Sequence, residues 1–288
     1  MPNKTKRKIY EITLKSLIYI SLAFTVLLLV SLIGYIFVKG VPHLSWELIS
    51  TSPRHSTGRI GILPNIINTL YIIGLTLVIA LPLGVGAAIY LTEYAKNKKL
   101  INVVEFTTET LAGIPSIIYG LVGMLFFVRL LGFKVSLLSG VFTMAIVILP
   151  TIIRTTQESL KSVPDSYREG SLGLGSGKWH MIKTVVLPSS IEGIITGCIL
   201  AIGRIVGESA ALLFTAGMGT VIASNIIRAF QSGGGSLSVA LYMYANERAE
   251  FDVAYAIAVV LLLLVIIINI GTKLTKNIVK KRAGGDAR

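Results

Sequence analysis

The sequence has little of what soluble enzymes and metal proteins usually depend on. Its 288 residues include a single cysteine, Cys198, which excludes an internal disulfide and a cysteine-based metal cage. The three histidines, His43, His55 and His180, do not have metal-ligand spacing. Charged residues make up only 14% of the chain, against about a quarter in an average soluble domain. A soluble single-domain protein is therefore not the expectation.

Apolar residues are what the chain has in excess. They make up 53% of it, and the mean hydropathy is +0.77. One soluble core cannot bury so many apolar side chains, so lipid must be the second solvent. Segments inside lipid must be helical, because an open strand leaves its backbone groups unsatisfied, and no barrel-type alternation is visible. The sequence therefore predicts an all-α integral membrane protein with six transmembrane helices. The expected spans are Ser16–Val38, Asn65–Leu91, Leu111–Val128, Val135–Ile153, Ile191–Gly217 and Val253–Thr272, the third of them starting a few residues earlier.

The distribution of positive charge predicts the orientation. Six spans place both termini on one side, and the segments of that side hold 19 of the 27 Lys and Arg residues, against 7 in the three opposite loops. Cytoplasmic segments are the ones enriched in Lys and Arg, so both termini are expected in the cytoplasm. This asymmetry explains most of the net charge of +13 without nucleic acid, for which a basic run interleaved with aromatic residues is missing.

Three prolines fall within the predicted spans. Pro82 is expected to kink the second span, and Pro115 and Pro150 are placed near the cytoplasmic ends of the third and fourth. Transport proteins use such breaks where backbone lines a cavity. Proline is also simply more frequent in membrane helices than in soluble ones, which explains any one of them equally well.

The stretch REGSLGLGSGKWHMIKTVVLP, residues 168–188, raises the question of a phosphate-binding loop. Such a loop needs a glycine where Leu172 stands and a hydroxyl where Trp179 stands, and it follows a strand. A dinucleotide-binding pattern fails as well, because its third glycine comes one residue early. The segment instead predicts short cytoplasmic helices that begin near Pro164, are separated by the glycines, and can dock in a groove of another protein.

The same stretch resembles the cytoplasmic loop of ABC-importer permeases, which reads E-A-A, three residues, G, nine residues, I-x-L-P. The whole spacing is present here, with two alanines replaced by glycine and serine and the isoleucine by valine. In that family the loop forms the helix that couples the permease to its ATPase. The residues that the resemblance assigns to ATPase coupling are Glu169, Gly170, Ser171, Gly175, Val185, Leu187 and Pro188. A helix that merely lies on lipid is the simpler alternative.

Longer stretches narrow the resemblance to the permeases of phosphate-specific importers, and within them to the A-type subunits rather than the C-type. LAGIPSIIYGLVG at 111–123 and GCILAIGRIVGESAALLFTAG at 197–217 are the closest of these, together with residues 149–179. One departure is that Ala211 stands where the family usually has proline, and Ser209 where it has threonine.

The resemblance implies the fold, the partners and the division of labour. The fold is that of type I (MetI-like) ABC importer permeases. The chain would pair with a homologous permease, bind a dimer of ATPase subunits below, and receive inorganic phosphate from an extracytoplasmic binding protein. It carries no cofactor, because ATP and Mg²⁺ bind to the ATPase. The implied location is a bacterial or archaeal cytoplasmic (inner) membrane.

Two ionisable residues lie inside the fifth predicted span. Arg204 and Glu208 are four residues apart, so they are expected on one helix face, close enough to neutralise each other. An arginine near mid-span costs about 3 kcal/mol or more unless it faces protein or water. Either Arg204 lines the substrate path with Glu208 supporting it, or the pair clamps two permeases together. The family's matching arginine is tied to phosphate passage, which favours the first interpretation.

Three further residues are candidates for the path. Arg154 also matches a family arginine, although a cytoplasmic charge anchor explains it equally well. Ser116 and Tyr119 follow the break at Pro115 and are possible path-lining groups. Glu105 and Glu109 precede the third span and are interpreted as the solvated start of its helix.

The expected organisation is a tail at 1–15, a first transmembrane helix with an extracytoplasmic loop at 16–64, a core permease domain at 65–272 with the coupling loop at 154–188, and a basic tail at 273–288. No catalytic arrangement is visible, so the chain is expected to be a non-catalytic transport subunit. A permease for sulfate or molybdate remains open. A membrane-embedded enzyme would need a paired acidic or histidine motif, and an ion-coupled carrier would need internal repeats; neither is visible.

Overall fold

The computed structural model describes residues 4–54, 59–220 and 226–285, and nearly all of them that lie in regular structure are helical. Strand pairing within these ranges is limited to one bridge between Arg54 and Arg59. The all-α prediction is confirmed. The long helices are α1 (Lys4–Gly40), α3 (Leu63–Ile89), α4 (Lys98–Gly113), α6 (Leu137–Lys161), α9 (Leu187–Gly207) and α13 (Phe251–Gly285). The shorter elements are η1 (Val41–His43), α2 (Trp46–Ser50), η3 (Tyr90–Tyr94), α5 (Ser116–Gly123), η4 (Met124–Leu130), α7 (Asp165–Gly173), α8 (Lys178–Met181), η5 (Ile182–Val186), α10 (Ala210–Thr215), α11 (Ile226–Gln231), α12 (Leu237–Tyr242) and η6 (Met243–Glu247).

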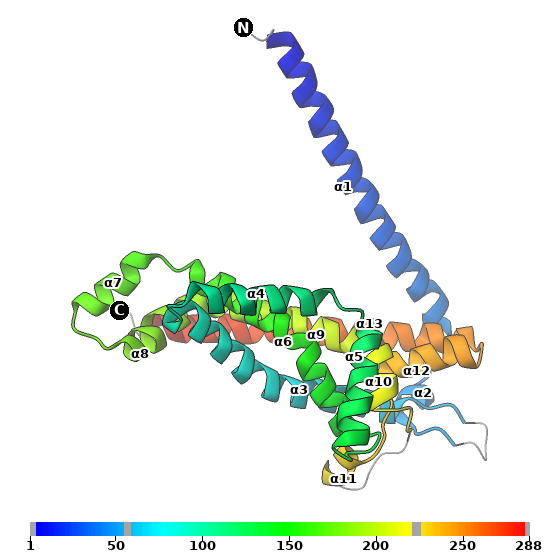
Figure 1. Ribbon diagram of the computed structural model, residues 1–288. Helices are drawn as coiled ribbons and strands as arrows, with labels where there is room; N and C mark the ends of the chain where they lie inside the picture. The colour runs from blue at the N-terminus through cyan, green and yellow to red at the C-terminus, as the bar shows by residue number, and fades with distance from the viewer. Residues whose placement is uncertain (1–3, 55–58, 221–225, 286–288) are drawn as a thin grey trace.

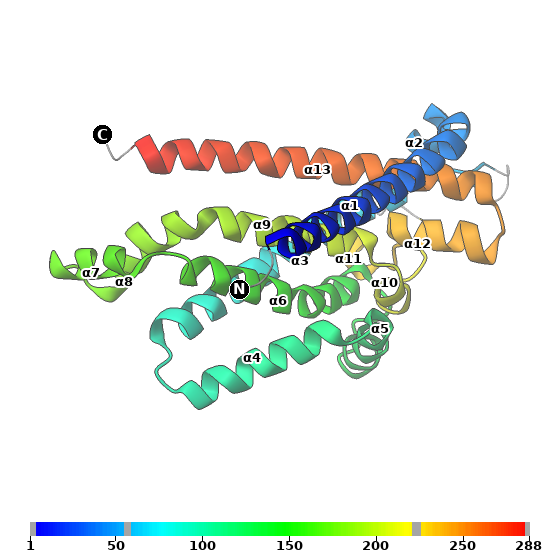
Figure 2. The same cartoon turned by 90° about the horizontal axis from the view of Figure 1, so that it is seen from above.

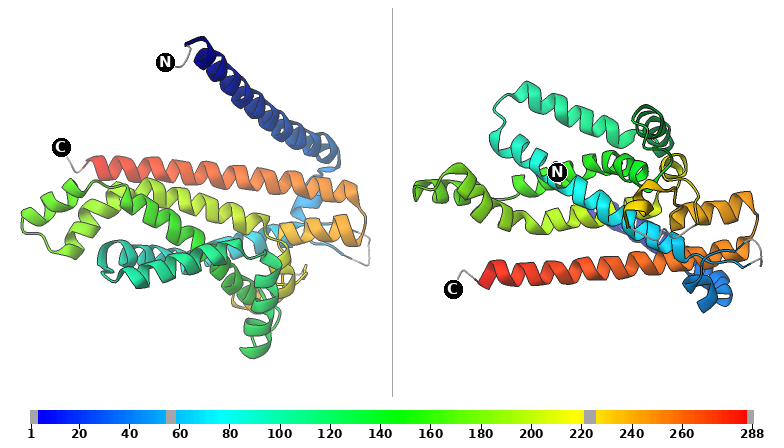
Figure 3. Two further views of the ribbon diagram at one scale, coloured as in Figure 1. Left: turned by 45° about the horizontal axis from the view of Figure 1, so that its top comes forward. Right: turned by 90° about the horizontal axis from the view of Figure 1, so that it is seen from below.

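Most of the long helices form one bundle. α13, α9, α6 and α3 lie side by side, and α4 runs along α6 at the edge (Figures 1 and 2). α7 and α8 extend beyond one end of the bundle, where α13 also ends, and α2, α10 and α12 gather at the other end (Figure 3). α1 contacts α13 near its own last turns and then diverges from the bundle (Figure 1).

The bundle core is built from apolar side chains and close backbone approaches. Ile148 and Ile152 of α6, Ala201 of α9 and Leu212 of α10 are among its buried members. Small residues allow the contacts: a Cβ added at Gly84 of α3 would lie 2.6 Å from Ile152. Glycine is the usual residue where membrane helices pack this closely. α3 and α6 therefore form a tightly packed pair.

The structure holds the six predicted spans when one bent helix pair is counted as a single span, and five otherwise. Five helical stretches are long and apolar enough to cross a membrane, beginning at Arg7, Leu63, Leu137, Lys178 and Phe251, and α4 with α5–η4 is the bent pair. α13 continues as helix to Gly285, through most of the predicted tail. α6 extends to Lys161, so Pro150 lies in its interior rather than near its end. α3 continues as one helix through Pro82.

The prediction for the third span was wrong in its start and its shape. α4 begins at Lys98 rather than near Leu111, and α4 and α5 meet at an angle of 100°. Pro115 explains the break, because it has no N–H to donate to the carbonyl of Leu111 one turn earlier. That carbonyl accepts instead from the backbone N–H of Ile114 at 3.2 Å and from the hydroxyl of Tyr119 at 2.7 Å. Both hydrogen bonds stabilise the end of α4 at the bend.

The fifth span ends ten residues before its predicted end at Gly217. α9 stops at Gly207, and Glu208 has extended backbone (φ −82°, ψ 119°) before α10 starts a new direction. The chain turns here although Ala211 replaces the family's proline, so proline is not needed for the turn. Arg204 consequently lies in the last turn of α9 rather than near the middle of a span.

Candidate functional site: a connector and a charged helix face

The segment between α6 and α9, residues 162–186, is named the connector. α7 starts after Pro164 with Asp165 in its first turn, and it ends at Gly173; α8 starts after Gly177. The start of α7 after Pro164 and the glycine-containing break between α7 and α8 confirm the prediction of short helices separated by the glycines. Leu187 and Pro188 begin α9, as expected for the entry into the fifth span.

The turn between α7 and α8 depends on Gly175. Its φ is +83°, a left-handed conformation that side chains with a Cβ rarely adopt. The hydroxyls of Ser171 and Ser176 lie 2.7 Å apart, and Ser176 also donates to the Ser171 carbonyl at 2.7 Å. Ser171 of the predicted coupling motif therefore shapes the turn.

The outer surface of the connector is apolar to an unusual degree. α7 has no buried residue, and Glu169 and Gly170 are exposed on it. Val185 is half-buried where the connector returns to the bundle. Large apolar side chains point outward along the connector: Tyr167, Leu172, Leu174 (91% exposed) and Trp179. Such a patch on a projecting segment is typical of a protein interaction surface.

Arg204 is a cation without a partner acid. Its side chain is half-buried, and within the described ranges it forms no ion pair. It lies within electrostatic range of the Tyr119 hydroxyl. A half-buried guanidinium without a neighbouring carboxylate can bind an anion through its planar set of N–H donors.

The expected Arg204–Glu208 pair does not form. Glu208 lies beyond the end of α9, so the two residues do not share a helix face. Its side chain is buried and accepts a hydrogen bond from the backbone N–H of Ala211 at 3.0 Å. A carboxylate is favourable there because the first N–H groups of a helix have no internal partner. Glu208 therefore caps α10, and Arg204 is not neutralised by it.

The two candidates after the bend differ in exposure. Tyr119 is buried, and its hydroxyl is occupied by the Leu111 carbonyl. Ser116 is half-exposed at the start of α5. Of the two, Ser116 is the one with a hydroxyl still free to face a path.

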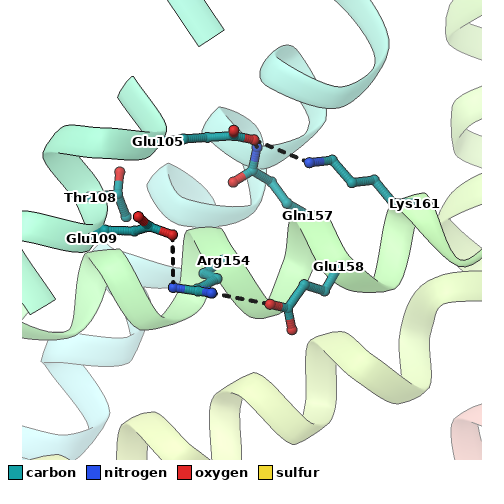
Figure 4. A pocket seen from close by; sticks show the side chains of 7 residues that line it. All are labelled: Glu105, Thr108, Glu109, Arg154, Gln157, Glu158 and Lys161. Carbon is teal, nitrogen blue, oxygen red and sulfur yellow. Dashed lines mark hydrogen bonds and ion pairs between the residues drawn. The ribbon is translucent and has the colours of Figure 1, made fainter. Parts of the chain in front are cut away.

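Arg154 lies in a charged pocket of about 180 Å³ between α4 and α6 (Figure 4). Its Nη1 is 3.2 Å from Glu109 and its Nε is 3.2 Å from Glu158. Lys161 is 3.1 Å from Glu105, which Gln157 also approaches. Arg154 is thus bound between two carboxylates, in contrast to Arg204.

The interpretation of Glu105 and Glu109 as a solvated helix start was wrong. Both lie in the interior of α4, which begins at Lys98 and ends at Gly113, and both face cations of α6 (Figure 4). An exposed charged face on a membrane helix bundle is stable toward water or protein and not toward lipid. This face therefore marks the polar side of the bundle.

Comparison with known proteins identifies the family. Residues 80–283 match the family described as "Binding-protein-dependent transport system inner membrane component". The chain belongs to this family. The permease is 42% identical to the "Probable ABC transporter permease protein YqgI" of Bacillus subtilis over 67% of its own length and 66% of that protein. It is 32% identical to the "Phosphate transport system permease protein PstA" of Haemophilus influenzae over 83% of each chain.

Solved structures confirm the fold. The permease resembles a chain of the bacterial alginate ABC transporter with a TM-score of 0.67, at 15% identity, over 96% of each chain. It also resembles a chain of the MetNI methionine ABC transporter with a TM-score of 0.58, at 21% identity, over 76% of the permease and 94% of that chain. Both show the type I importer permease fold expected from the sequence.

Sequence reasoning missed one pair in the permease that the structure brings together. Glu93 received no role, although it lies two residues after the second predicted span, and Arg168 was only the first residue of the coupling stretch. In the structure Nη2 of Arg168 lies 3.0 Å from Glu93. The available signal was that Glu93 is the first charge after 33 uncharged residues, 60–92, on the same side of the membrane as the coupling stretch.

Proposed function

We propose that this permease is the PstA-type subunit of an ATP-driven importer of inorganic phosphate. The names of two relatives, from Haemophilus and Yersinia, support the assignment to a phosphate importer, because both are called phosphate transport system permease proteins. The observation that carries the substrate class is Arg204, a half-buried cation without a carboxylate partner among the described residues. A planar guanidinium with several donors suits a phosphate oxyanion.

The two arginines give the path a direction. At 1.5 Å per residue, Arg204 lies ~26 Å along α9 from its connector end, and Arg154 ~10 Å along α6 from its connector end. Phosphate first meets Arg204, whose charge is unopposed. Arg154 becomes available deeper in the path only when it leaves Glu109 and Glu158. Ser116 lines the path, Tyr119 supports the bend beside it, and Glu208 holds α10 in place.

A second, homologous permease of the PstC type completes the path. α1 supports this arrangement, because no side chain in its most apolar stretch is buried within the described chain. Its outward apolar side chains meet lipid and the partner's helices. The charged face of α4 and α6 then borders the shared aqueous path rather than lipid.

The connector supports docking to an ATPase. Its exposed apolar side chains and the motif residues Glu169, Gly170 and Gly175 enter a groove of a PstB-type ATPase dimer, and Val185, Leu187 and Pro188 carry the movement into α9. ATP and Mg²⁺ bind there, so this chain is a non-catalytic transport subunit. A PstS-type binding protein delivers phosphate at the opposite end of the bundle.

The same assignment sets the orientation in the cytoplasmic (inner) membrane. The connector and the end of α13 share one end of the bundle, and most of the Lys and Arg residues belong to that side (Figure 3). That end is cytoplasmic under the positive-inside rule, and so are both termini.

The test is labelled-phosphate uptake at low phosphate in cells that lack this gene and carry either the wild type or Arg204→Gln. Removing one charge-assisted contact costs about 1.5–3 kcal/mol, so we expect uptake to fall about 10- to 100-fold at equal membrane levels. Arg129→Gln is the matched control, because Arg129 is an exposed arginine at the end of α5–η4.

Sulfate and molybdate uptake are measured in the same cells. Restoration of one of these anions instead of phosphate would transfer the substrate assignment to that oxyanion within the same fold. Uptake that persists without the ATPase would support an ion-coupled carrier. Equal phosphate uptake by Arg204→Gln and the wild type would remove Arg204 from the path.

A further inference from the structure

The connector is attached to the bundle at two places of different chemistry. α8 and η5 are held by an apolar cluster in which Met181, Ile182 and Val186 pack with Ala88 of α3 and Leu160 of α6. α7 has no such packing, because none of its residues is buried. α7 packs only against η5 and α8 among its closest neighbours, and polar contacts attach it to the end of α6 and the turn after α3.

A single side chain supplies most of those contacts. The Nε and Nη2 atoms of Arg168 donate to the same Glu93 oxygen, at 3.1 and 3.0 Å. Nη2 also donates to the carbonyl of Leu160 at 2.8 Å, and Nη1 to that of Val163 at 2.6 Å. These carbonyls lie at and just beyond the end of α6, where helix carbonyls lack internal donors. One guanidinium thus joins α7, the end of α6 and the turn that follows α3.

The Arg168–Glu93 pair is also the best shielded ion pair of the described residues. The side chains of Arg168 and Glu93 are 15% and 6% exposed, whereas each other ion pair has at least one side chain more than a third exposed. Breaking a buried pair by removing one partner leaves an uncompensated charge in a low-dielectric site. Separating Arg168 from Glu93 therefore costs more free energy than separating an exposed ion pair.

We propose that Arg168 and Glu93 form the joint through which movement of α7 is passed to the α3–α6 pair. Without this joint α7 stays connected to the bundle through the link at Val163, which packs in the apolar cluster, and through its contacts with η5 and α8. None of these connections fixes α7 directly to the turn after α3, so α7 can pivot on them without moving α3 and α6 by the same amount. With it, α7 follows α6 and α3, which are themselves locked together at Gly84 and Ile152. The two residues are positioning residues, and this inference rests on the proposed transport function.

The turn η3 strengthens the joint from the neighbouring position. Tyr94 follows Glu93 directly, and the ammonium of Lys178 at the start of α8 lies 5.0 Å from the centre of its ring. A cation over an aromatic face is attractive at this distance. Adjacent residues of one turn therefore hold both helices of the connector.

The test uses the purified permease pair with its ATPase and binding protein in liposomes that contain ATP. Phosphate taken up and ATP hydrolysed are measured together for the wild type, Glu93→Gln and Arg168→Lys. Coupling between distant sites is typically worth five- to 150-fold. We therefore expect the phosphate-to-ATP ratio to fall about fivefold or more, with equal amounts of ATPase retained on the complex. Glu47→Gln is the control, because Glu47 pairs with Arg59 on the surface near the opposite end of the bundle.

The outcomes separate the joint from the function beneath it. An unchanged phosphate-to-ATP ratio in both variants overturns the joint. Glu93→Gln could lower the yield of the complex, and Arg168→Lys then serves as the test. This variant keeps the positive charge beside Glu93 but removes the guanidinium that reaches the carbonyls of Leu160 and Val163. An unchanged phosphate-to-ATP ratio in Arg168→Lys also overturns the joint. If the wild-type complex transports another oxyanion, only the phosphate assignment is overturned. The joint is then tested with the ratio of that anion taken up to ATP hydrolysed.

Discussion

Arg154 and Arg204 have opposite electrostatic surroundings although both are matched to arginines of the family. Arg154 is more than half exposed and lies between the carboxylates of Glu109 and Glu158. Arg204 is half-buried, and within the described ranges it has no acid beside it. The free energy of binding an anion is more favourable at a guanidinium that does not first have to leave a carboxylate. This difference is why Arg204, and not Arg154, is the first contact proposed for phosphate.

Gly175 is the position where backbone conformation and coupling can be separated. A Cβ there would meet no atom within 4 Å, so only its φ of +83° restricts the residue. Asparagine tolerates this conformation and valine does not. We expect Gly175→Asn to keep most phosphate uptake and Gly175→Val to lose most of it, measured at equal membrane levels.

Gly74→Ala is the control for that comparison. Gly74 lies within α3, outside the connector, with free space around it, and alanine is favoured over glycine in a helix by about 0.5–1 kcal/mol. Uptake should be unchanged in this variant. Equal uptake by the asparagine and valine variants at position 175 would contradict the role given to the turn.

The bend between α4 and α5 gives the bundle its polar face. Because the chain turns by 100° after Ile114, α4 lies along α6 instead of continuing into α5. Glu105 and Glu109, four residues apart on α4, then meet Lys161 and Arg154 of α6 (Figure 4). The position of one proline thus decides which charges face one another.

Removing the two carboxylates beside Arg154 should alter transport more than stability. Exposed ion pairs contribute about 1 kcal/mol or less, so the melting temperature of Glu109→Gln/Glu158→Gln in detergent should change by about 4 °C or less. Arg154 then keeps its charge free and holds phosphate longer. We expect a lower KM for uptake together with a lower maximal rate.

Glu105→Gln serves as the comparison, since Glu105 pairs with Lys161 and not with Arg154. Its uptake parameters should stay close to those of the wild type. If the double variant matches Glu105→Gln in both KM and maximal rate, Arg154 takes no part in the path.

The permease as a whole has two ends formed by different elements. One end holds the connector and the end of α13, with the exposed Leu174, and the other holds α2 with the exposed Trp46 (Figure 1). α1 leaves the bundle with its apolar side chains uncovered by the described chain, so lipid or other helices must cover them. The proposed orientation of these ends rests on the distribution of Lys and Arg along the sequence.

Cysteine labelling can test that orientation because Cys198 is the single cysteine of the chain. In a Cys198→Ala background, Trp46→Cys should react with a membrane-impermeant maleimide added to intact cells, and Lys96→Cys should react only after the cells are opened. Both sites are exposed, and Lys96 lies outside the connector. The reverse pattern would invert the orientation proposed for the termini and the connector.

The sequence by itself determined that the protein lies in lipid, how many spans it has, that these spans are helical, and where the connector helices begin and end. These follow from apolar run lengths, from the need to satisfy backbone groups in lipid, and from local turn chemistry at Pro164 and the glycines, all of which act over short distances along the chain. Partner choice among charges was decided only by the tertiary structure. The predicted pairing of Arg204 with Glu208 was wrong, because α9 ends one residue before Glu208. Arg168 pairs with Glu93, 75 residues away, because α3 and α6 end side by side. Ion pairs between helices depend on where each helix stops and which face it turns to its neighbour, and spacing along one chain segment does not contain that information.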